Sequence, residues 1–66
     1  MNAQAKPKVD VALWISNATR TQLNKAITRL RMASMNYNEV EAAKAEDFIM
    51  KMEYELLGRA LTTLLA

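Results

Sequence analysis

The chain has 66 residues, a net charge of +2, and neither cysteine nor histidine. A domain of this size buries only about 60% of the surface that its unfolded chain exposes, so its core is marginal. Composition excludes disulfides and the commonest transition-metal ligands, which leaves self-association as the expected means of stabilisation. With one Gly and one Pro, the sequence also offers little turn chemistry for a β-rich fold.

Residues 1–9 are polar and basic and are predicted to form a flexible N-terminal arm. A helical pattern follows, in which apolar and small side chains recur at alternating spacings of four and three residues. This is the heptad pattern of a helix that packs against another helix. The recurring residues are Ala12, Ser16, Thr19, Leu23, Ala26, Leu30, Ala33 and Tyr37. We therefore expect one helix over residues 10–35.

A turn is expected at residues 36–38. Asn38 is a typical helix N-cap, and Glu41, three residues later, completes a capping box. The second helix is expected over residues 39–65, with a seam of its own that faces the first helix. That seam comprises Ala42, Ala45, Ile49, Met52 and Leu56, followed by Arg59 or Ala60 and then by Thr63. The predicted fold class is all-α, an antiparallel two-helix hairpin over residues 10–66.

Folding the two helices together gives a register for the hairpin. Leu23 then meets Met52 in the core. Basic and acidic side chains lie beside each other on one flank, with Arg31 next to Glu46 and Arg20 next to Glu53. Exposed ion pairs of this kind contribute only about 0–1 kcal/mol each. They therefore favour one register of the two helices and add little to the stability of the hairpin.

The second helix carries another apolar stripe, rotated by roughly 130° from its seam if residues advance about 100° each. A two-helix hairpin buries only one of the two stripes, so the other needs a partner. We expect a second copy there, giving a homodimer in a four-helix arrangement. The expected dimer-interface residues are Met50, Tyr54, Leu57, Leu61 and Leu64. The alternative is that this stripe binds a different chain.

The last leucines of the second helix have a further expected role. In the hairpin they are level with Val9, Val11, Leu13 and Ile15. We expect these side chains to form an aliphatic plug at that end of the molecule.

A second surface is expected to bind a larger protein. Aromatic and methionine side chains are typical of adaptable or anchoring contacts, and a basic side chain beside them adds a charged contact. The candidate partner-binding residues are Trp14, Lys25, Arg29, Met32, Met35 and Tyr37.

Charge leaves nucleic acid open as another partner. Residues 1–36 carry six basic and one acidic side chain, whereas residues 37–66 carry three basic and six acidic ones. Such halves either pair with each other or leave the basic half for nucleic acid. One specific form of this nucleic-acid-binding alternative is a ribbon-helix-helix DNA binder, in which residues 8–16 would form a strand. Base-reading strands use Arg, Lys, Asn, Gln or Thr, however, and Asp10, Ala12 and Trp14 would occupy the reading face.

Catalytic and cofactor signatures are not found in the sequence. Glu39, Glu46 and Glu53 recur every seven residues, but carboxylate metal sites in helical bundles also use histidine. Gly58 alone makes no phosphate-binding loop. No apolar run approaches the roughly 18 residues of a membrane span, so a cytoplasmic protein is expected.

The sequence therefore predicts a non-enzymatic protein-binding regulator without a cofactor or small-molecule substrate. It would act as an inhibitor, anti-activator or adaptor by occupying a surface of a larger protein. The alternative function is a small basic helical dimer that binds DNA or RNA.

Overall fold

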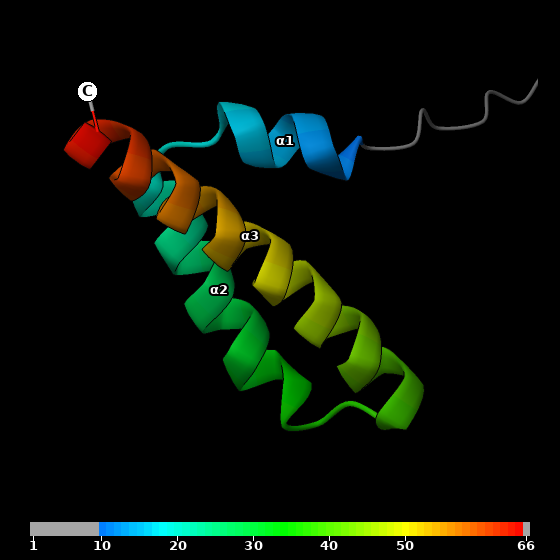
Figure 1. Ribbon diagram of the computed structural model, residues 1–66. Coiled ribbons are helices and arrows are strands. Elements are labelled where there is room, and N and C mark those ends of the chain that lie inside the picture. The colour runs from blue at the N-terminus through cyan, green and yellow to red at the C-terminus, as the bar shows by residue number, and fades with distance from the viewer. Residues whose placement is uncertain (1–9, 66) are drawn as a thin grey trace, which may run out of the picture.

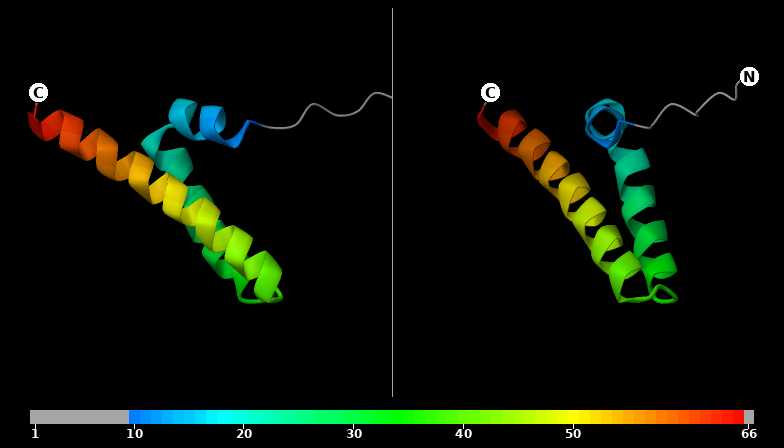
Figure 2. Two further views of the ribbon diagram at one scale, coloured as in Figure 1. Left: turned by 45° about the vertical axis from the view of Figure 1, so that its right-hand side comes forward. Right: turned by 90° about the vertical axis from the view of Figure 1, so that its right-hand side faces the viewer.

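The computed structural model describes residues 10–65, which form three α-helices and no strand (Figure 1). The helices are α1 (Val11–Asn17), α2 (Arg20–Ser34) and α3 (Glu39–Leu65). α2 and α3 run antiparallel from a short turn, and α1 lies across their other end (Figures 1 and 2). The all-helical class is confirmed. The arm expected at residues 1–9 lies outside the described residues.

The helix expected over residues 10–35 is instead two helices, which is the main difference from the sequence prediction. Ala18 and Thr19 are extended, with ψ angles of 147° and 161°. Thr19 begins α2 through a capping box: its Oγ1 accepts from the Gln22 N–H at 3.0 Å, and Gln22 Oε1 accepts from the Thr19 N–H at 2.8 Å. The heptad pattern continues through this point, but the local caps end one helix and begin another. A base-reading strand over residues 8–16 is also wrong, because Val11–Asn17 is helical.

Replacing Thr19 with alanine should lower the free energy of unfolding by about 1 kcal/mol, because α2 loses its cap. Thermal unfolding followed by circular dichroism measures the loss. Thr21→Ala is the matched control, since Thr21 is exposed in the first turn of the same helix. Equal losses in the two variants would show that the cap contributes nothing.

The turn between α2 and α3 has the predicted capping box. The Glu41 N–H donates to Asn38 Oδ1 at 2.9 Å, and the Asn38 N–H donates to Glu41 Oε1 at 3.3 Å. Glu39 and Glu41 lie in the first turn of α3, where acidic side chains favour the positive end of the helix dipole. This local chemistry fixes where the chain reverses.

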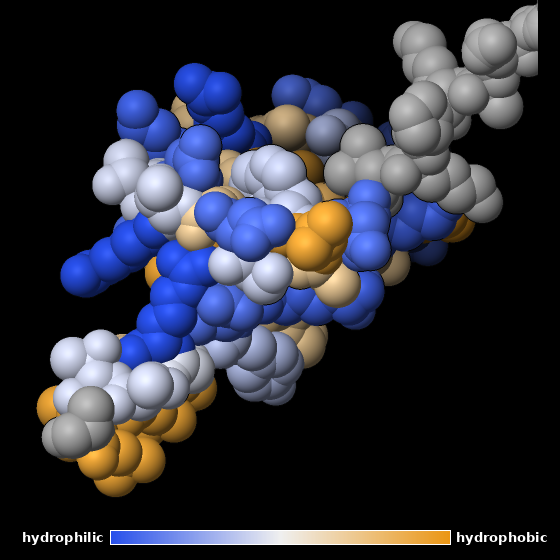
Figure 3. Space-filling view, turned by 90° about the horizontal axis from the view of Figure 1, so that it is seen from above, coloured by the Kyte–Doolittle hydropathy of each residue, from blue (hydrophilic) through white to orange (hydrophobic). Residues whose placement is uncertain are grey.

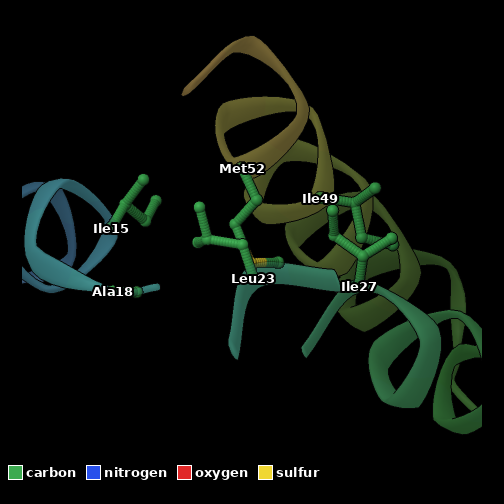
Figure 4. Close-up of a cluster of buried hydrophobic side chains, with 6 residues drawn as sticks. All are labelled: Ile15, Ala18, Leu23, Ile27, Ile49 and Met52. Atoms are coloured by element: carbon green, nitrogen blue, oxygen red, sulfur yellow. The ribbon is translucent and has the colours of Figure 1, made fainter. Parts of the chain in front are cut away.

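The core lies where the three helices meet (Figure 4). Leu23 from α2 and Met52 from α3 are fully buried and point toward each other, as the predicted register requires. The remaining members of the buried cluster are Ile15, Ala18, Ile27 and Ile49. α1 thus supplies Ile15 and Ala18 to the core, whereas Ala12, Ser16 and Thr19, expected in the helix seam, are exposed.

The interhelical ion pair differs from the expected one. Arg31 Nη2 lies 2.6 Å from Glu53 Oε2, and Glu46 lines the same pocket as these two residues. Side chains lean toward the N-terminus of their own helix. Arg31 therefore leans away from the turn and Glu53 leans toward it. In this way the two side chains meet although their backbone positions lie at different levels along the helix pair.

The aliphatic plug expected near the C-terminal end of α3 does not form. Because α1 turns across the α2–α3 pair, α3 extends past both other helices (Figure 2). Leu13 on α1 and Leu61, Leu64 and Leu65 on α3 are all exposed. Apolar side chains gather at this end of α3, beside the grey C-terminal residue in Figure 3.

Candidate protein-interaction surface

A regular apolar surface runs as a row along α3, and we name it the α3 seam. It comprises the five predicted dimer residues Met50, Tyr54, Leu57, Leu61 and Leu64. Each is exposed, from 47% for Met50 to 79% for Leu64. Their spacings of four and three residues keep them in one row over about 21 Å of helix, at 1.5 Å per residue. Large apolar side chains in a continuous exposed row are typical of a contact surface.

The α3 seam lies roughly opposite the core-facing side of the same helix. Ala45, Ile49 and Met52 are buried, and these residues are about 130° around the helix from the seam at about 100° per residue. α1 and α2 both pack against α3, and neither covers the seam. A single chain therefore buries one apolar side of α3 and leaves the other in water.

Charged residues border the seam. On one border, Lys51 Nζ lies 3.0 Å from Oδ2 of Asp47, which continues the row of the seam one turn before Met50. On the other, Glu53 accepts the bond from Arg31 described above. All four side chains are about half exposed or more. They give the seam polar edges and leave its centre apolar, which is the usual anatomy of a protein interface.

Arg59 has a structural role that the sequence pattern did not predict, although the pattern placed Arg59 or Ala60 in the seam that faces the first helix. Its Nη2 donates to three carbonyl oxygens at the C-terminal end of α1: Ala18 at 2.8 Å, Ile15 at 3.2 Å and Ser16 at 3.3 Å. Its Nε donates to Glu55 Oε2 at 2.8 Å. A cation at the C-terminal end of a helix satisfies unpaired carbonyls and favours the dipole. Arg59 therefore attaches α1 to α3, and its signal in the sequence is a lone basic side chain among leucines.

Replacing Arg59 with methionine should detach α1, because a side chain of similar length loses every donor. Hydrogen bonds to charged groups contribute about 1.5–3 kcal/mol. Amide hydrogen exchange over residues 13–18 should then accelerate at least tenfold, while the amides of α2 keep their protection. Arg29→Met is the control, because Arg29 is exposed on α2. Unchanged exchange in α1 would show that its apolar contacts alone hold it.

A second apolar surface, which we name the aromatic flank, lies beside α1. Trp14 packs edge-to-face against Phe48 of α3, with ring centroids 6.4 Å apart. Phe48 also lines a shallow groove with Tyr37, Leu30 and Ala45. Trp14 and Tyr37 remain 39% and 38% exposed. The flank thus joins two predicted partner-binding residues through Phe48, which the sequence reasoning did not select.

The other predicted partner-binding residues are separated from the aromatic flank. Lys25 and Arg29 line an open polar groove on α2 with Thr21 and Thr28. Met32, near the end of α2, and Met35, in the turn that follows, are also exposed. In the single helix expected over residues 10–35, Trp14 would lie on the same outer face as Lys25, Arg29 and Met32 at helical spacing. The break at Ala18 and Thr19 removes that common face, because Trp14 turns with α1.

Within residues 10–65, no three acidic side chains gather closely enough to hold a metal ion. None of the three helices combines the length and apolarity needed to cross a membrane.

No protein-family model, curated protein sequence or solved structure matches the chain. Its surfaces are therefore interpreted from their own chemistry.

Proposed function

We propose that the chain is a non-enzymatic, protein-binding regulator that works as a homodimer. The α3 seam carries this proposal, because five large apolar side chains lie exposed in one heptad row. Full burial of four such side chains per subunit stabilises an assembly by about 10 kcal/mol per subunit before association costs. For a chain of this size, a gain of that order decides whether the fold is stable.

The aromatic flank supports the second half of the proposal, a larger protein as partner. Pairing along the α3 seam leaves Trp14, Tyr37 and Phe48 on a different side of the molecule. Aromatic side chains beside a groove are typical anchors of protein interfaces. The dimer would present this surface twice, and it would act by occupying a site on its target.

The oligomeric state of the purified full chain tests the first half. Sedimentation velocity at several concentrations should show a dimer that dissociates on dilution. A monomer at all concentrations would overturn self-association. Capture of a target by the immobilised chain tests the second half, and Tyr37→Ala should weaken it while Met35→Ala, an exposed change off the flank, should not.

A nucleic-acid function is the second candidate, because Lys25 and Arg29 lie one turn apart on an open face of α2. Binding of this kind weakens steeply as salt rises. Retention on heparin that falls with salt and is lost in Lys25→Glu/Arg29→Glu would favour it. Retention that is unaffected by salt and by the double substitution would contradict a nucleic-acid function.

A further inference from the structure

We propose that two copies of the chain pair along the α3 seam in antiparallel orientation, with Tyr54 of each copy packed against Leu57 of the other. This inference rests on the proposed self-association and adds the orientation and register. In this register Met50 lies opposite Leu61 of the second copy. The centre of the contact is then apolar over four successive layers, and both seams are used along most of their length.

Asp47 is the first observation that favours antiparallel pairing. It lies in line with the seam, one turn before Met50, where the heptad spacing calls for an apolar residue. In parallel pairing each residue of the seam lies opposite the same residue of the second copy. The two Asp47 carboxylates would therefore face each other. Antiparallel pairing places the two Asp47 residues at opposite ends of the contact.

The charge distribution along α3 points the same way. Residues 39–49 hold four acidic side chains and one basic one, whereas residues 50–65 hold two of each. Parallel pairing sets the two acidic segments side by side. Antiparallel pairing separates them, and it also opposes the two helix dipoles.

The borders of the seam also fit this arrangement. In antiparallel helices each border meets the same border of the other copy. Lys51 then lies beside Gly58 of the second copy, and Glu53 lies beside Ala60. Each long charged side chain therefore faces a small residue, and no like charges meet.

Gly58 has no other evident use in the described part of the chain. Apart from its chain neighbours and the backbone of its own helix, no heavy atom there lies within 4 Å of where its Cβ would be, although glycine inside a helix is unfavourable. In antiparallel pairing, the small size of Gly58 leaves room for the aliphatic part of the Lys51 side chain of the second copy.

Parallel pairing offers one compensation, an ion pair between Glu46 and Lys51 of the second copy. Exposed ion pairs of this kind contribute little. Lys51 already has Asp47 at 3.0 Å within its own helix. The pair therefore does not offset two facing Asp47 carboxylates.

Disulfide trapping in the full chain separates the arrangements, because the chain has no cysteine of its own. Met50→Cys and Leu61→Cys are made separately and oxidised with glutathione disulfide, each alone and as an equal mixture. We expect the mixed 50–61 disulfide to exceed either symmetric one at least tenfold by mass spectrometry. Met35→Cys, exposed and off the seam, gives the rate for random collision.

Each other result overturns the inference in a distinct way. Rapid symmetric disulfides from each variant alone would show parallel pairing. Trapping at the collision rate, in a chain that sediments as a dimer, would show a different register or surface. A chain that sediments as a monomer would overturn the proposed self-association together with the inference.

Discussion

Leu57→Glu should convert the proposed dimer into a helical monomer, with a dissociation constant about a hundredfold higher or more. Leu57 lies at the middle of the α3 seam and is 54% exposed in a single chain. Glutamate at this position is tolerated in the monomer, but in the dimer it brings two carboxylates into an apolar contact. Loss of two buried leucines alone removes about 3–6 kcal/mol at about 1.5–3 kcal/mol each. Sedimentation velocity measures the change, and circular dichroism reports whether the helices remain.

Val40→Glu is the matched control for this experiment. Val40 is on the same helix and is 65% exposed, but it lies outside the seam and in the first turn, where an acidic residue suits the helix dipole. The variant should dimerise like the unmodified chain. Equal weakening by both substitutions would indicate a general effect of charge on association and not a contact through the seam.

Sequence patterns were sufficient for the parts of the fold that depend on local chemistry or on one helix face. Asn38 and Glu41 gave the start of α3, and the heptad spacing placed Leu23 opposite Met52. The pattern failed at Thr19 because periodicity and capping compete there. A capping box at Thr19 ended the helix although the apolar spacing continued. The sequence signal of this box, Thr19 with Gln22 three residues later, was present in the chain.

The candidate surfaces show a similar division. The α3 seam was predictable because all of its residues belong to one helix, so their relation depends only on helical geometry. The aromatic flank was not, because Trp14 and Phe48 come together only when α1 folds across α3. The role of Arg59 was not predictable for the same reason: its acceptors are carbonyls of a helix end that the continuous-helix prediction did not contain.

Leu23→Ala should cause the largest loss of stability of any single change to the core, about 2–5 kcal/mol. Leu23 is fully buried between α1 and α3, so truncation leaves a cavity that three helices must close. Proteins of this length have a total stability of roughly 3–10 kcal/mol, at 0.05–0.15 kcal/mol per residue. Thermal unfolding followed by circular dichroism, at one fixed concentration since a dimer melts in a concentration-dependent way, measures the effect.

Leu13→Ala makes the same chemical change at an exposed position of α1 and should alter the free energy of unfolding by no more than about 0.5 kcal/mol. Met52→Ala provides a sharper test, because Met52 fills the space opposite Leu23. The double variant Leu23→Ala/Met52→Ala should lose less than the sum of the single losses, since residues in contact share one cavity. Additive losses would place the two side chains in separate parts of the core and would contradict the packing of α2 against α3.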